Sequence, residues 1–362
     1  ANEIWWLETV GGHHWIARRV PDDCYVTMPN QLGIDEFDVE DGIGEQVNYM
    51  CSADMRDFIE RNHLDLAVEG SMPFSPRDAF GSHSDSDHVY NTPRAWYMQR
   101  YFNPFDEVWD GPDADHKPNS DDIPWCRQPD RKISMEDVKY ILSSHYQETP
   151  FDPYGSLGDA ASRTRFRPIG INRTNHLAVM QIRPYRPQVN RAVQWLAYGS
   201  NPFNAMVPFF PNVDDTPAYL RDTTTRVTSE NFYWANRLIG VLCDAQFAET
   251  ANAVETYQQK VGALGHAMVR AADEQVNRLG GTAVLEAASR EREANAEFAE
   301  DEQPMSPDEI ITAVRNPEVR EVLATANDDL ARKLKKETEK LLDSALFTSS
   351  LAMKNHFAMS DN

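Results

Sequence analysis

The hydrophobic pattern of this chain changes near residue 229. Before that point, short strand-like runs alternate with short helical segments. The runs "EIWWLETV" and "HWIARRV" are separated by Gly11 and Gly12, which predicts a β-hairpin because glycine tolerates the positive φ of a tight turn. After Ser229, apolar residues recur at helical spacing. We therefore expect an α+β protein with a mixed portion over residues 1–228 and a helical portion, packed on it, over residues 229–362.

Short sequence patterns predict two helices and one long loop. Ser134, with Asp137 three residues later, predicts a helix that begins with a capping box. Thr92 followed by Pro93 predicts a second helix, with threonine as N-cap and proline at the first helical position. Residues 103–130 are rich in proline, aspartate and glycine and predict a long surface loop.

Charge and cysteine content exclude several classes of function. The chain has 35 basic and 57 acidic residues, a net charge of −22, which repels phosphate backbones and anionic membranes. We therefore expect no nucleic-acid or membrane partner. Four cysteines without a CxxC pair predict neither a disulfide framework nor a zinc ribbon. A cytoplasmic location is the favoured expectation.

Metal-binding motifs are weak in this sequence. The segment "HSDSDH", residues 83–88, offers two imidazoles and two carboxylates, but its spacing fits no standard metal loop, and a polar loop before a helix is the alternative. His13 and His14 are adjacent in a predicted strand, where successive side chains point to opposite faces, so we do not expect them to share a ligand. We expect no metal and no cofactor.

Three residues in the first hundred are candidates for chemistry. Cys24 would need a nearby base to act as a nucleophile, and a small buried apolar residue is the alternative. Asn30 follows a proline at a predicted strand end, where its amide is a suitable oxyanion donor or, alternatively, a turn residue bonded to its own backbone. Arg94 places a cation in the first turn of a helix, against the macrodipole, so it serves a site or pairs with Asp85 or Asp87.

Six long segments resemble one enzyme family. The cysteine dipeptidases of peptidase family C69 are similar, in order and over nearly the whole chain, to "WWLETVGGHHWIARRVPDDCYVTMPNQLGIDEFD", "YNTPRAWYMQRYFNP", "PWCRQPDRKISMEDVKYILSSHYQETPFDPYG", "RPIGINRTNHLAVMQIRP", "WLAYGSNPFNAMVPFF" and "FYWANRLI". The resemblance implies an N-terminal nucleophile hydrolase with a four-layer αββα sandwich. Penicillin V acylase and bile salt hydrolase belong to the same class.

The resemblance also implies a mechanism. In this class a cysteine at the mature N-terminus attacks the amide, and its own α-amine, with a pKa near about 7.7–8.0, serves as the base. Residue 1 here is alanine, so we expect the nucleophile segment to be missing from this chain, which alone would be inactive. An interior cysteine has no such amine, which makes Cys24 structural. The resemblance assigns Asn30 to the oxyanion hole and Arg94 to positioning or electrostatic support.

The expected partners are a short peptide substrate, the missing segment that carries the nucleophile, and a second copy of the chain in a homo-oligomer. Two alternatives remain open at this point. One is a related amide hydrolase of the bile salt hydrolase or penicillin V acylase type. The other is a non-catalytic fragment or subunit.

Overall fold

The computed structural model describes residues 3–65, 74–82, 84–279 and 315–354. The chain forms two compact units, residues 1–169 and 170–362. Small antiparallel sheets and helices occur in both units, which confirms the α+β class. The change of pattern at residues 228/229 lies inside the second unit, and the described elements after it are helices.

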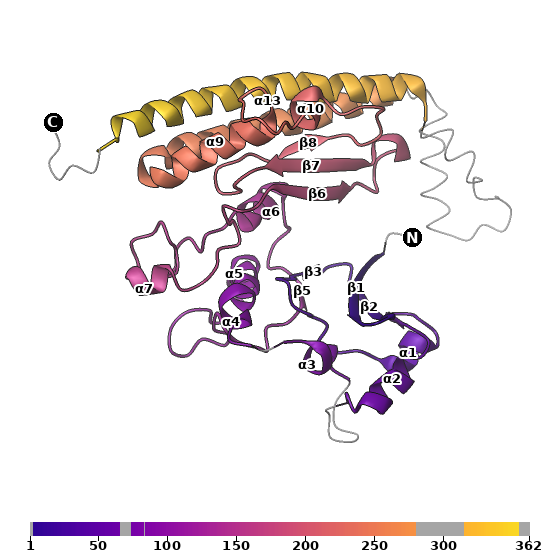
Figure 1. Ribbon diagram of the computed structural model, residues 1–362. Helices are drawn as coiled ribbons and strands as arrows, with labels where there is room; N and C mark the ends of the chain where they lie inside the picture. The colour runs from indigo at the N-terminus through magenta and orange to yellow at the C-terminus, as the bar shows by residue number, and fades with distance from the viewer. Residues whose placement is uncertain (1–2, 66–73, 83, 280–314, 355–362) are drawn as a thin grey trace. The chain divides into compact units, whose positions relative to one another are not determined.

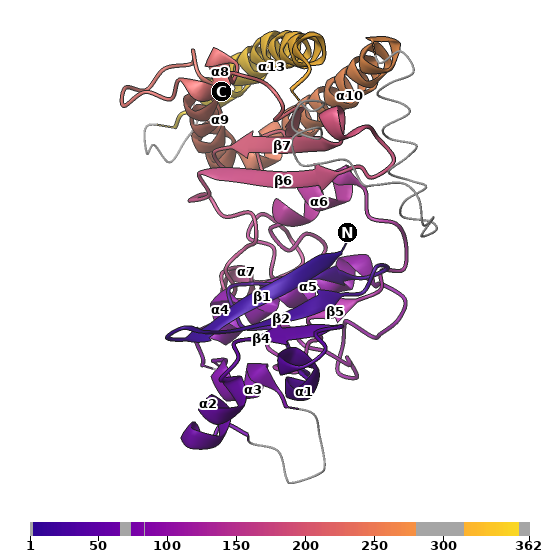
Figure 2. The same ribbon diagram turned by 90° about the vertical axis from the view of Figure 1, so that its right-hand side faces the viewer.

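The first unit contains a three-stranded antiparallel sheet. Its strands β1 (Ile4–Gly11), β2 (His14–Val20) and β4 (Tyr49–Cys51) follow the order β1-β2-β4 and lie side by side in Figure 2. The predicted hairpin is confirmed, because β1 and β2 pair and Gly11 and Gly12 both have positive φ, 119° and 59°. A second, two-stranded pair joins β3 (Tyr25–Val26) to β5 (Cys126–Arg127).

The hairpin turn corrects one expectation from the sequence. His13 lies in the turn and His14 is the first residue of β2, so the two side chains do not alternate across one strand. The pairing register also shifts between Thr9 and Gly11. The two imidazole rings lie on the same side, with centroids 4.1 Å apart. The expectation that they point to opposite faces is wrong, because strand alternation begins only at His14.

Seven helices are described in the first unit: α1 (Val39–Ile43), α2 (Met55–Asn62), α3 (Pro76–Phe80), α4 (Asp87–Tyr90), α5 (Thr92–Phe102), α6 (Met135–Leu142) and α7 (Ala160–Arg163). The core around α2 joins Ile16 of the sheet to Met55. The core around α5 contains Trp96 together with Trp109 and Ile123. Residues 103–130 are therefore not only a surface loop, because their apolar side chains fill the core beside α5.

The predicted capping box of α6 is present. Asp137 accepts hydrogen bonds from the Ser134 backbone nitrogen (2.8 Å) and hydroxyl (2.8 Å), and the Ser134 hydroxyl accepts from the Asp137 nitrogen (3.1 Å). Arg131 donates to both oxygens of the same carboxylate, at 2.8 and 2.7 Å. These bonds, that of Arg131 first, hold the pKa of Asp137 well below its ordinary value, although burial opposes them.

We expect the variant Asp137→Asn to be less stable than the wild type at pH 7. A carboxylate with a lowered pKa in the folded state stabilises the fold above its unfolded pKa of about 3.9, and this stabilisation is lost as the pH falls towards the folded pKa. The stability difference between the two proteins should therefore be smaller at pH 3 than at pH 7. Urea unfolding at both pH values measures it, and an equal difference at the two would contradict this role of Asp137.

The second unit is a small sheet covered by long helices. Strands β6 (His176–Ile182), β7 (Ala192–Tyr198) and β8 (Val207–Phe209) are antiparallel in the order β6-β7-β8. The helices described in this unit are η1 (Gln188–Asn190), α8 (Ala218–Arg221), α9 (Phe232–Ala245), α10 (Phe247–Leu279) and α13 (Pro317–Leu351). Figure 1 shows α9 and α10 beside the sheet, and α13 packs along these two helices. Among the described residues, none of the helices has the length and apolar composition needed to cross a bilayer.

Candidate active site

Arg94 lies in the first turn of α5, as the sequence predicts. The helix begins one residue earlier than expected, because Thr92 is already helical and Asn91 is the N-cap. The Thr92 hydroxyl does not cap the helix; instead it accepts a hydrogen bond from the Gln31 amide nitrogen at 3.2 Å. This bond ties the start of α5 to the loop that follows β3.

The structure brings the two predicted site residues together. The Arg94 Nη2 atom donates to the Asn30 Oδ1 atom at 3.0 Å and to the Pro29 carbonyl oxygen at 2.7 Å. Nη2 also lies 2.7 Å from the Asn91 Oδ1 atom, and Nε donates to the Tyr90 carbonyl oxygen at 2.5 Å. The guanidinium therefore links the start of α5 to the loop of Asn30, which lies 64 residues earlier in the chain.

The acceptors of Arg94 within the described chain are neutral oxygen atoms, so the alternative of an ion pair with Asp85 or Asp87 is not what the structure shows. Asp87 instead accepts from the Asn91 amide at 2.5 Å. Burial lowers the pKa of Arg94, and the neighbouring Arg167 lowers it further. The site is thus electropositive and partly desolvated, and it attracts negative charge that develops nearby.

Asn30 presents one end of its amide to solvent. Its backbone is left-handed, with a φ of 67°, a conformation that asparagine tolerates better than most residues. Because Oδ1 accepts from Arg94, the amide is oriented with Nδ2 pointing away from the guanidinium. In the part of the chain that is described, Nδ2 has no acceptor. Within the described residues, no hydrogen bond joins the Asn30 side chain to its own backbone. Asn30 is exposed, so Nδ2 is an oriented neutral donor.

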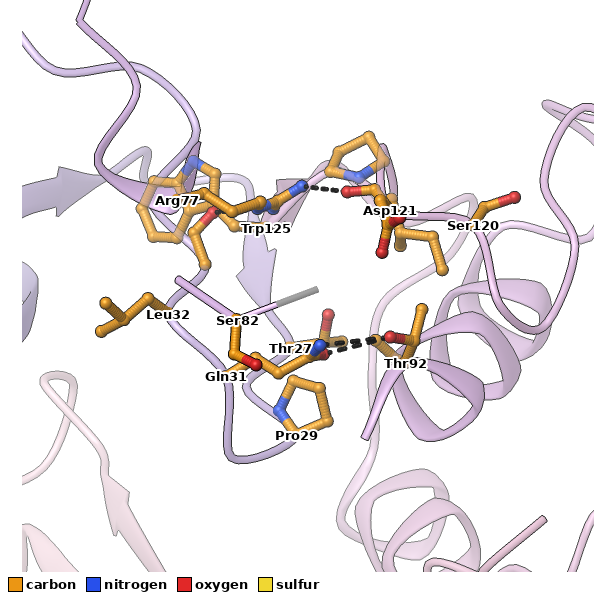
Figure 3. A pocket seen from close by; sticks show the side chains of 14 residues that line it. Thr27, Pro29, Gln31, Leu32, Arg77, Ser82, Thr92, Ser120, Asp121 and Trp125 are labelled. Carbon is orange, nitrogen blue, oxygen red and sulfur yellow. Dashed lines mark hydrogen bonds between the residues drawn. The ribbon is translucent and has the colours of Figure 1, made fainter. Parts of the chain in front are cut away.

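A cavity of about 40 Å³ lies behind this loop. Figure 3 shows Pro29 and Gln31, the neighbours of Asn30, lining it together with Thr92 and Arg77. Arg77 donates to the Gly33 carbonyl oxygen at 2.7 Å and so holds the far end of the same loop. The volume accommodates a few water molecules but not a peptide. The cavity therefore lies within the part of the structure that supports the Asn30 loop.

The four cysteines lack the properties of a nucleophile. Burial raises the pKa of the thiol at Cys24 and at Cys243, that of Cys51 to about 11, and that of Cys126 to about 12. Cys24 donates to the carboxylate of Asp23 at 3.5 Å, and a neighbouring anion disfavours the thiolate further. Each of these shifts disfavours the thiolate. Cys24 is half-buried, and its structural role stays a prediction.

Two features near the site were not anticipated from the sequence. Tyr146 is fully buried with a left-handed backbone (φ 68°), and its hydroxyl donates to the Arg167 carbonyl oxygen at 2.7 Å. His145 Nδ1 lies 2.7 Å from Asp152 Oδ1 in a buried pair. The histidine and the aspartate seven positions later are a weak signal for the pair, whereas nothing local indicates the conformation of Tyr146.

The segment "HSDSDH" does not gather around a common point in the residues that are described. His83 lies outside them. The Ser84 hydroxyl donates to Asp87, the first residue of α4, at 2.9 Å, and His88 Nε2 lies 2.8 Å from Asp121 Oδ1. These contacts agree with the alternative of a polar loop before a helix.

Comparison with known proteins identifies the family. The model of Peptidase family C69 matches residues 1–260. The chain is 71% identical, over its whole length, to a protein named dipeptidase from Bifidobacterium longum, of which it covers 68%. It is 44% identical over 99% of its length to a probable dipeptidase A from Streptococcus pyogenes, covering 65% of that protein. It is 41% identical over 77% of its length to dipeptidase A from Lactobacillus helveticus, covering 56% of that protein.

The chain therefore spans about two thirds of the length of the first two of these relatives. The family match extends over the strands, the Asn30 loop and α5, which carry the site described above. The chain belongs to peptidase family C69.

Proposed function

We propose that the complete protein is a cysteine dipeptidase that hydrolyses short peptides. The observation that carries the proposal is the hydrogen bond from Arg94 to Asn30 Oδ1 at 3.0 Å, which leaves Asn30 Nδ2 as an oriented donor in an electropositive site. A donor of this kind stabilises the oxyanion of a tetrahedral intermediate. The names of the relatives supply the class of substrate.

We assign the nucleophile to an N-terminal cysteine outside these 362 residues. The raised thiol pKa values of the four cysteines in this chain support the assignment, and so does the greater length of the relatives. An α-amine with a pKa near about 7.7–8.0 is tethered to such a cysteine and can take its proton at neutral pH. The completed fold is proposed to be the four-layer αββα sandwich of the N-terminal nucleophile hydrolases.

The reaction has two steps. The thiolate attacks the peptide carbonyl, and the carbonyl oxygen becomes an oxyanion that accepts a hydrogen bond from Asn30 Nδ2. The α-amine, now protonated, gives its proton to the leaving amine, and a thioester remains. Water then attacks the thioester, again with the amine as base, and releases the second product. Arg94 holds the Asn30 amide in the same orientation during both steps.

A substrate panel tests the proposal. We expect the full-length protein to release amino acids from dipeptides at a rate well above that for a conjugated bile salt or penicillin V. Faster hydrolysis of either acylase substrate would assign the site to that related class instead. Hydrolysis of none of them, in a protein that contains its N-terminal cysteine, would indicate a non-catalytic subunit.

A further inference from the structure

The turn of the first hairpin carries a cluster of three metal-ligand side chains. His13 and His14 lie at the β1–β2 turn, and Asp54 immediately precedes α2. One ligand atom from each of the three lies within 4.8 Å of the others. This cluster is separate from Asn30 and Arg94, and the proposed peptidase chemistry does not use it.

The hydrogen bond between His14 and Gly11 determines which ring nitrogen of His14 carries a hydrogen. Nδ1 lies 3.1 Å from the Gly11 carbonyl oxygen, which can only accept, so Nδ1 carries the hydrogen. In the neutral ring, Nε2 then carries a lone pair. This atom is buried, has no hydrogen-bond partner within the described chain, and lies 3.4 Å from the Asp54 Oδ2 atom. The His14 Nε2 lone pair and the Asp54 carboxylate oxygen are both acceptors, and they face each other. A cation bound between them would remove their mutual repulsion.

His13 completes the arrangement. Its Nε2 atom lies 2.9 Å from the same oxygen, Asp54 Oδ2. Ligand atoms bound at 2.0–2.1 Å to a tetrahedral zinc ion lie about 3.3 Å apart. The 3.4 Å contact of His14 is close to that value, whereas the 2.9 Å contact of His13 is a hydrogen bond that a bound ion would replace. The backbone carbonyl bonded to His14 Nδ1 is the usual outer partner of a metal-binding histidine.

We propose that His13, His14 and Asp54 form a binding site for a divalent transition-metal ion, with zinc as the best fit. Two imidazoles and one carboxylate are a borderline-soft ligand set that suits zinc better than calcium or magnesium. Three protein ligands leave the fourth tetrahedral position to water. The ion links the hairpin turn to the beginning of α2, two segments that are 40 residues apart in the chain.

The surroundings hold one ligand rigidly and leave the others accessible. His14 is only 8% exposed, and its ring stacks on Phe58 of α2 at 3.8 Å between centroids. The side chains of His13 and Asp54 are 71% and 40% exposed, so an ion can enter from solvent. Asp54 makes no side-chain capping bond to α2, so its carboxylate is available to the metal.

Zinc titration of the chelator-treated protein tests the site. The variants are Asp54→Asn, which keeps the size of the side chain, and His14→Gln. The matched control is His63→Asn, which changes an exposed histidine at the C-cap of the same helix, where the backbone is left-handed and tolerates asparagine. Bound zinc per chain and the zinc-induced rise in Tm are recorded at pH 7.5. The visible spectrum of the cobalt-loaded protein reports tetrahedral coordination.

We expect the wild type and His63→Asn to bind one zinc ion that Asp54→Asn and His14→Gln bind at least about tenfold more weakly. A zinc ion bound elsewhere in the protein would be retained by both site variants. Equal zinc affinity in the wild type, Asp54→Asn and His14→Gln, or no binding by the wild type, would overturn the proposal.

Discussion

Replacing Asn30 with aspartate is expected to lower kcat for dipeptide hydrolysis by about 10²–10³-fold in the full-length protein. Removal of a single oxyanion donor has an effect of that size. Aspartate has the same shape and tolerates the left-handed backbone of Asn30, but its carboxylate cannot donate and would pair with Arg94. The substrate KM should change little, because the lost hydrogen bond forms mainly in the transition state.

The variant Asn30→Gly distinguishes a loss of catalysis from a loss of folding stability. Glycine adopts a φ of 67° without strain but has no amide. We expect the same loss of kcat with an unfolding midpoint close to that of the wild type. Arg94→Lys keeps the charge but loses the planar guanidinium that orients the Asn30 amide. Because the two residues act together, the effects of Arg94→Lys and Asn30→Gly on kcat should not add in the double variant. Wild-type turnover by a folded Asn30→Gly protein would remove Asn30 from the mechanism.

The largest effect on stability is expected in the second unit. Asp273 is 2% exposed and accepts from Arg183 Nη1 at 2.7 Å and Nη2 at 3.1 Å. The Asn190 amide donates to the same carboxylate at 2.7 Å, and Arg186 Nε lies 3.3 Å from it. Arg183 is itself only 4% exposed. The carboxylate thus joins α10 to the segment that connects β6 and β7.

The variant Asp273→Ala should lower the free energy of unfolding by about 3–5 kcal/mol, because it leaves the buried Arg183 guanidinium without its counter-charge. Urea unfolding followed by circular dichroism measures the loss. The matched control is Asp329→Ala in α13, which removes an ion pair with Arg332 whose side chains are 46% and 77% exposed. An exposed pair contributes little, so this control should unfold like the wild type. Equal stability of Asp273→Ala and the control would contradict the role of the buried pair.

Local structure was predictable where a short pattern determines it. The Gly11–Gly12 hairpin and the Ser134–Asp137 capping box depend on residues within a few positions of each other, and both are present. The turn also shows the limit of such patterns. Strand alternation predicts opposite faces for His13 and His14. However, β2 begins at His14 and His13 is still in the turn, so the alternation does not apply to this pair.

Long-range structure was predictable only in part. Asn30 and Arg94 are candidates on local grounds, and the resemblance to a family favours their functional role, but no local pattern predicts their contact, which spans 64 residues. Trp109 and Ile123 lie in a segment rich in polar residues, and they are buried because the segment packs beside α5. The composition of the segment does not indicate this packing. The conformation of Tyr146 likewise follows from its tertiary surroundings.

Alkylation of the active full-length protein tests the central claim most directly. Iodoacetamide is added below saturation, residual dipeptidase activity is followed, and the modified cysteine is identified by peptide mapping. We predict that activity is lost in proportion to modification of one N-terminal cysteine outside these 362 residues, while Cys24, Cys51, Cys126 and Cys243 remain unmodified. Loss of activity in proportion to modification of any of these four would contradict the assignment of the nucleophile.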